Sequence, residues 1–61
     1  MEYVLKIIKC TDPLMWYADK VGETVPFIKK ISDDEYLSRE DAGYANIVKV
    51  EDSEIIVKNL N

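Results

Sequence analysis

The chain has 61 residues, of which 48% are apolar and 10% aromatic, and its formal net charge is −4. A chain this short makes one domain, residues 1–61, and buries only about 60% of the surface that it exposes when unfolded. Cys10 is the only cysteine and histidine is absent, which excludes an internal disulfide and a Cys/His zinc site. We therefore expect a compact single core, with homodimerisation as one way of adding stability.

The apolar content is that of a folded protein rather than a disordered one. No apolar run approaches the roughly 18 residues that a membrane span requires. The apolar stretch 3–8 is short, is interrupted by Lys6 and lacks a small-residue cleavage site. With a free thiol and no targeting segment, the sequence predicts a cytoplasmic protein that does not insert into membranes.

The charge is unevenly distributed along the chain. Residues 33–54 carry eight acidic side chains against two basic ones, whereas residues 1–32 carry four acidic and five basic. An acidic surface repels phosphate backbones, and nucleic-acid binding normally depends on clustered Lys and Arg. Direct binding of DNA or RNA is therefore not expected.

Strand patterns dominate the sequence, because β-branched and aromatic residues recur in short runs between turn residues. We expect five strands, at residues 3–10, 24–31, 36–38, 44–50 and 54–58. In the second strand Val25, Phe27 and Ile31 should share one face, and Pro26 places that strand at an edge or bulge because it lacks an N–H.

The sequence also predicts the loop and turns that connect these strands. Residues 11–23 predict a long structured loop, because Asp12 bonds nearby backbone groups and Pro13 disfavours helix before it. Residues 32–35 and 39–43 predict turns, and Gly22 and Gly43 are each expected at a positive φ angle. Residues 51–53 predict a single 3₁₀ turn before the last strand. The expected fold is thus all-β, a small five-stranded barrel whose closure removes exposed strand edges.

The order of these elements resembles an SH3-like barrel, in which one 3₁₀ turn precedes the last strand. The segments that carry the resemblance are Gly22-Glu23-Thr24-Val25 and residues 48–56. Residues 16–22 and the pair Gly43-Tyr44 are in addition similar to small uncharacterised SH3-like proteins of Firmicutes and their phages. The resemblance implies a fold and an origin, not an activity. The Ala-Leu-Tyr-Asp-Tyr motif of eukaryotic signalling SH3 domains is missing, which argues against binding of proline-rich peptides.

Catalytic equipment is missing from the sequence, so we do not expect an enzyme. Without histidine the usual general base near neutral pH is lacking, and Cys10 is interpreted as a small buried residue at a strand end. Acidic side chains cluster in two places that could in principle serve acid–base catalysis, residues 33–35 and the set Glu51, Asp52 and Glu54. Both clusters fall in or beside predicted turns, where water screens their charges. No calcium-loop or phosphate-loop pattern is present, so no metal and no cofactor is expected.

The apolar and aromatic cluster Leu14-Met15-Trp16-Tyr17 in the long loop is the most informative feature. Large apolar side chains in a loop do not all point inward, and Trp and Tyr are enriched at protein interfaces. We expect Met15, Trp16 and Tyr17 to form an aromatic groove with Tyr36 and Tyr44. In the alternative interpretation the loop plugs an open end of the barrel, and the two combine if Trp16 is buried while Tyr17 is exposed.

The acidic face of residues 33–54 has two interpretations as well. It is either a solvated surface or a docking face for a basic partner, including a mimic of nucleic-acid charge. Our leading hypothesis is a non-catalytic protein-interaction module in which the aromatic loop supplies contact area. The acidic turns supply orientation, with Asp33, Asp34 and Glu35 as the expected binding residues. If the origin is a phage, we expect the partner to be a host protein and the role to be inhibition of host defence.

Two other functions stay open on the sequence alone. One is a small-molecule-binding oligomer, or sponge, with its pocket between subunits, because a small barrel leaves little internal room. The other is a structural component of a larger assembly, in which the apolar loop is permanently covered.

Overall fold

The computed structural model describes residues 2–58, within which the chain forms six β-strands and one 3₁₀ turn. The elements are β1 (Glu2–Ile7), β2 (Thr24–Pro26), β3 (Lys29–Lys30), β4 (Glu35–Arg39), β5 (Ala45–Lys49), η1 (Val50–Asp52) and β6 (Ser53–Lys58). The all-β class is confirmed, as is a 3₁₀ turn directly before the last strand. Among residues 2–58 no helix is long and apolar enough to cross a bilayer.

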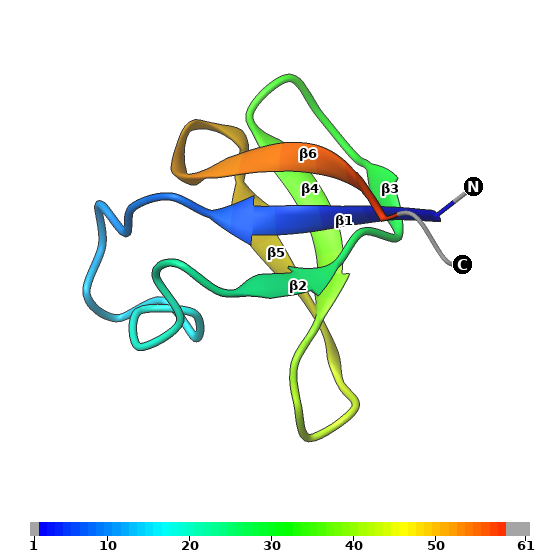
Figure 1. The fold of residues 1–61 in the computed structure, drawn as a ribbon. Coiled ribbons are helices and arrows are strands. Elements are labelled where there is room, and N and C mark those ends of the chain that lie inside the picture. Colours follow the sequence, from blue (N-terminus) through cyan, green and yellow to red (C-terminus); the bar gives the residue numbers. More distant parts are fainter. Residues whose placement is uncertain (1, 59–61) are drawn as a thin grey trace.

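The strands form two antiparallel sheets of three strands each. The first has the order β2-β1-β6 and the second the order β3-β4-β5. Figure 1 shows the first sheet crossing in front of the second, with β1 and β4 as the central strands. The pairings of residues 2–58 do not join the two sheets into a closed barrel.

The core lies between the two sheets, and the alternation of side chains along each strand places it there. In β1, Leu5 and Ile7 are fully buried while Lys6 between them is exposed. In β4, Tyr36 and Ser38 point inward on the same principle. The buried apolar residues are Leu5, Ile7, Tyr17, Val25, Tyr36 and Val48.

The predicted second strand, residues 24–31, is in fact two strands in different sheets. Pro26 is the last residue of β2, and a proline fits there because its nitrogen points away from β1, outside the ladder. The chain then passes to the second sheet, where β3 begins at Lys29. The Ser38 hydroxyl donates to the Pro26 carbonyl at 2.6 Å and ties the sheets together at this crossing. Val25 is 5% exposed but Ile31 is 43% exposed, so the shared face expected from the sequence was wrong for Ile31.

The first strand is also shorter than expected. It ends at Ile7 rather than at Cys10, and the N–H groups of Ile8 and Lys9 both donate to the carbonyl of Asp52 in η1. Cys10 is partly buried against the core, and its thiol donates to the carbonyl of Asp12 at 3.0 Å. The interpretation of Cys10 as a packed side chain therefore holds in part.

Both glycines adopt the positive φ angles predicted from the sequence, 92° at Gly22 and 97° at Gly43. A Cβ at Gly43 would meet no atom within 4 Å, so only backbone strain opposes a side chain there. We expect Gly43→Ala to lower the free energy of unfolding by about 1–2 kcal/mol. Urea unfolding measures this, and Gly43→Asn should lose less, since asparagine tolerates this region. Equal stability of Gly43→Ala and the parent would contradict the prediction.

Candidate interaction surface

The long loop of residues 11–23 is ordered by its own backbone and side-chain bonds, as predicted. The Asp12 carboxylate accepts from the Leu14 N–H at 3.0 Å, and the Asp12 carbonyl accepts from the Met15 N–H. At the other end, the Gly22 N–H donates to the carbonyl of Ile7. An ion pair of 2.6 Å between Lys20 and Asp41 joins the loop to the turn after β4. The loop is therefore a fixed part of the fold.

Tyr17 anchors this loop from inside the protein. Its side chain is 0% exposed, and its hydroxyl donates to Oδ2 of Asp52 at 2.6 Å and accepts from the Lys49 N–H at 3.3 Å. Burial, with the hydrogen bond to Asp52, raises the pKa of Tyr17 above its ordinary value. The expectation that Tyr17 contributes an exposed contact is corrected, because the residue belongs to the core.

Asp52 is the buried partner of that hydroxyl. The sequence placed it in a solvated turn, but the structure buries it completely beneath the loop. Its Oδ2 also lies 3.4 Å from the Thr11 hydroxyl, whereas Oδ1 has no hydrogen-bond partner among residues 2–58. The position of η1 at the base of the loop explains the difference, because the side chain points toward Tyr17 rather than toward water.

Trp16 and Met15 pack against the core while remaining partly exposed. The indole Nε1 of Trp16 donates to the carbonyl of Ile47 in β5 at 2.7 Å, and its ring meets the Tyr17 ring edge-on at 5.7 Å. Leu14 at the tip is 92% exposed. The loop thus covers the core with Trp16 and Tyr17 and presents Leu14 to solvent, the one residue of the predicted cluster that was not among the expected contacts.

The expected aromatic groove is not formed. Tyr36 is buried in β4, where its ring meets Phe27 edge-on at 5.6 Å. Tyr44 is 72% exposed and precedes β5, at the opposite end of the β4–β5 ladder from Tyr36. Period-two alternation along β4 turns Tyr36 inward, so it cannot share a surface with Tyr44.

The three acidic residues of the predicted site do come together, in a cleft beside η1. Asp33, Asp34 and Glu35 line a cavity of about 400 Å³ that we name the acidic cleft. Its other lining residues are Lys49, Val50 and Glu51. The Val50 N–H donates to the Asp34 carbonyl at 2.9 Å and holds the turn against η1. Four acidic residues and one lysine thus line the cleft, and Glu51 is a member that the predicted site lacked.

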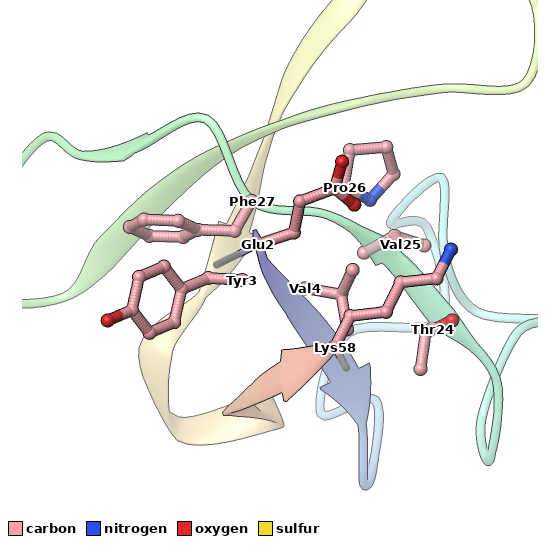
Figure 2. A pocket seen from close by; sticks show the side chains of 8 residues that line it. All are labelled: Glu2, Tyr3, Val4, Thr24, Val25, Pro26, Phe27 and Lys58. Atoms are coloured by element: carbon pink, nitrogen blue, oxygen red, sulfur yellow. The ribbon is translucent and has the colours of Figure 1, made fainter. Parts of the chain in front are cut away.

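A second cavity, of about 620 Å³, lies on the first sheet and contains none of the predicted site residues. Figure 2 shows Tyr3 and Phe27 side by side among the side chains that line it, which include Lys58. We name it the strand cleft; its lining is Glu2, Tyr3, Val4, Thr24, Val25, Pro26, Phe27 and Lys58. The sequence placed its apolar residues in the first two predicted strands and in no predicted site. The only signal for it was Pro26, where the chain leaves the sheet.

Within residues 2–58, no three Cys, Asp or Glu side chains are arranged to hold a metal ion. No protein-family model matches the chain, and neither a similar curated protein nor a similar solved structure was found.

Proposed function

We propose that this chain is a non-catalytic protein-interaction module that binds a basic segment of a partner protein in the acidic cleft. The observation that carries the proposal is the convergence of Asp33, Asp34, Glu35 and Glu51 on one concave surface. Like charges gathered in a cleft focus the electrostatic potential and attract ligands of opposite sign. A Lys or Arg side chain would gain charge-assisted hydrogen bonds there.

An exposed apolar residue of the long loop is a second candidate contact. The loop of residues 11–23 is bonded to β5 through Trp16 and Ile47, and to Lys49 through the Tyr17 hydroxyl. Lys49 itself lines the cleft. These bonds fix the loop to the strand that ends at the cleft, and the exposed Leu14 of this loop would supply apolar contact area. In this proposal the partly exposed Met15 and Trp16 contribute at the margin of the contact.

We also propose that the two sheets are the two halves of an SH3-like barrel. The passage of the chain from β2 to β3 across Pro26 and the 3₁₀ turn before β6 support this assignment. If the origin is a phage, the basic partner is a host protein, and occupation of its basic surface inhibits its role in defence. The location would be the cytoplasm, where such partners occur.

The test is a nuclease-treated pull-down followed by affinity measurement with the captured protein. We expect Asp33→Asn/Asp34→Asn to weaken binding about tenfold or more, because two cleft carboxylates are lost. The matched control is Glu2→Gln/Glu23→Gln, which removes the same charge from exposed positions outside the acidic cleft. Leu14→Ser should also weaken binding without lowering stability. Binding should fall as ionic strength rises.

Equal effects of the cleft and control variants would mean that net charge alone attracts the partner, which would contradict a specific cleft. Failure to capture any protein would favour the second candidate function, binding of a small molecule in the strand cleft. That candidate is supported by the volume of about 620 Å³, which falls within the range of ligand pockets. Thermal-shift measurements with nucleotide-like ligands would then test it. No partner and no ligand would favour a structural role in a larger assembly.

A further inference from the structure

Among residues 2–58, strand β6 pairs with one strand and leaves its other edge open. It lies at the margin of the first sheet and pairs with β1 along all six of its residues. Figure 1 shows it as the outermost strand of this sheet, on the side of β1 away from β2. Sheet edges present unused backbone N–H and C=O groups, so proteins usually shorten or interrupt them. The β6 sequence, Ser-Glu-Ile-Ile-Val-Lys, contains neither proline nor glycine.

The backbone bonds of β1 show which β6 residues face outward. Ile7 donates its N–H to Glu23 and accepts from Gly22, so its backbone faces the β2 side. Because successive residues in a strand direct these groups to opposite sides, Lys6 faces β6, where its partner is Glu54. By the same alternation, Glu54, Ile56 and Lys58 bond to β1, whereas Ile55 and Val57 direct their backbone groups away from it.

The two outward-bonding residues also carry exposed apolar side chains. Ile55 is 45% exposed and Val57 is 48% exposed, although both lie on the same face of the sheet as the buried Leu5. Among residues 2–58, no loop or turn supplies a backbone hydrogen bond to either residue. The open edge therefore combines unused hydrogen-bonding groups with side chains that gain from being covered.

We propose that this edge pairs antiparallel with the same edge of a second copy of the chain, giving a six-stranded sheet across a twofold axis. The backbone groups of Ile55 and Val57 are paired only in registers where each of these residues lies opposite a β6 residue of the other copy that also directs its backbone groups outward. One such register is centred on Ile56, which lies opposite Ile56 of the other copy. In it, Ile55 of each copy lies opposite Val57 of the other copy. Glu54 then lies opposite Lys58 of the other copy at both ends.

Charge complementarity selects this register and this occupant. Opposite charges directly across an antiparallel pair are stabilising, and like charges are destabilising. In the neighbouring allowed register, Ile55 lies opposite Ile55 of the other copy. Glu54 then lies opposite Ile56, and both ion pairs are lost. The edge is thus complementary to itself, as an interface around a twofold axis requires. It does not overlap the acidic cleft, so its test is independent of the proposed function.

The first experiment uses two oppositely charged variants, Glu54→Lys and Lys58→Glu. In the proposed register each variant opposes like charges in its own dimer, whereas a mixture of the two opposes unlike charges at both ends. We expect sedimentation equilibrium to show a dimer of the parent chain and a dissociation constant about tenfold or more higher for each variant alone. The mixture should recover the parent dissociation constant through a heterodimer, which native mass spectrometry identifies by mass.

Circular dichroism decides whether each variant is folded before its association is measured. Charge reversal can disturb the pairing of Glu54 with Lys6, or of Lys58 with Glu2, within one chain. A second pair of variants, to proline, tests the interface in that case. Val57→Pro removes an outward N–H and should abolish the dimer while the chain stays folded, because edge strands tolerate proline with its nitrogen toward solvent. Ile56→Pro removes an N–H bonded to β1 and should unfold the chain.

Amide hydrogen exchange provides the direct readout. In the dimer the N–H groups of Ile55 and Val57 should be protected, and the protection should disappear on dilution to the monomer. A chain that stays monomeric at millimolar concentration, or a dimer in which these two amides exchange freely, would overturn the proposal. Failure of the mixed charge variants to associate would overturn the register.

Discussion

Tyr17→Phe is expected to lower the free energy of unfolding by about 2–3 kcal/mol and the melting temperature by roughly 10–20 °C. The hydroxyl is the closest hydrogen-bond donor to the buried Asp52 carboxylate, at 2.6 Å, and it is the acceptor of the Lys49 N–H. Without it, Oδ2 keeps only the longer contacts from Thr11, and Oδ1 has no partner among residues 2–58. A buried acceptor left unsatisfied costs most when it is charged.

The matched control is Tyr36→Phe, measured by the same urea unfolding. Tyr36 is buried in the same core, but among residues 2–58 its hydroxyl makes no hydrogen bond, so its removal should change stability by less than about 0.5 kcal/mol. Asp52→Asn should lose less than Tyr17→Phe, because the amide oxygen can still accept from the hydroxyl. Similar losses in the two Tyr→Phe variants would show that the Tyr17–Asp52 bond adds nothing.

Stability is expected to fall steeply above pH 10. In the folded chain the pKa of Tyr17 lies well above its ordinary value, because of burial and the bond to Asp52, whereas in the unfolded chain the phenol titrates near pH 10. Below pH 10 both states hold the proton and the contribution of this bond is complete. Above it the unfolded state loses the proton first, so stability declines by about 1.4 kcal/mol per pH unit.

The measurement is the free energy of urea unfolding between pH 8 and pH 12, for the parent and for Tyr17→Phe. The Lys20–Asp41 ion pair raises the pKa of Lys20, and its contribution is also lost as the pH rises. The variant keeps that ion pair, so the difference between the two curves isolates Tyr17. Parallel curves across this range would contradict the assignment. Absorbance of tyrosinate provides a second check, since one tyrosine should ionise only on unfolding.

The strand pattern allowed much of the fold to be predicted. Alternation in β1 and β4, the positive φ angles at Gly22 and Gly43, and the turn η1 all follow from local chemistry. The division of residues 24–31 between two sheets does not, because it depends on which strands Val25 and Lys30 meet. Local propensity carries no information about those partners.

The candidate site was predictable only where it is local. Asp33, Asp34 and Glu35 are consecutive and stay together in the acidic cleft, but Glu51 joins them through the fold. Tyr17 was expected at the surface because the partner that lets its hydroxyl be buried, Asp52, lies 35 residues further along the chain and could not be identified from the sequence. Tyr36 was expected beside Tyr44 because the sequence did not show the register of β4 with β5, which places the two residues at opposite ends of the ladder. Burial of a loop aromatic depends on a distant polar partner, which the sequence does not identify.

The pairing of β1 with β6 also determines when this protein can fold during its synthesis. The central strand of the first sheet finds one neighbour in β2, but its other neighbour is the last strand, with Glu2 opposite Lys58. A nascent chain that still holds β6 inside the ribosomal tunnel lacks that neighbour and also Asp52, which fixes the long loop. Closure of such distant segments is slow for β-proteins. Translation therefore has to release β6 before the core can form, and until then Leu5 and Ile7 stay accessible to chaperones.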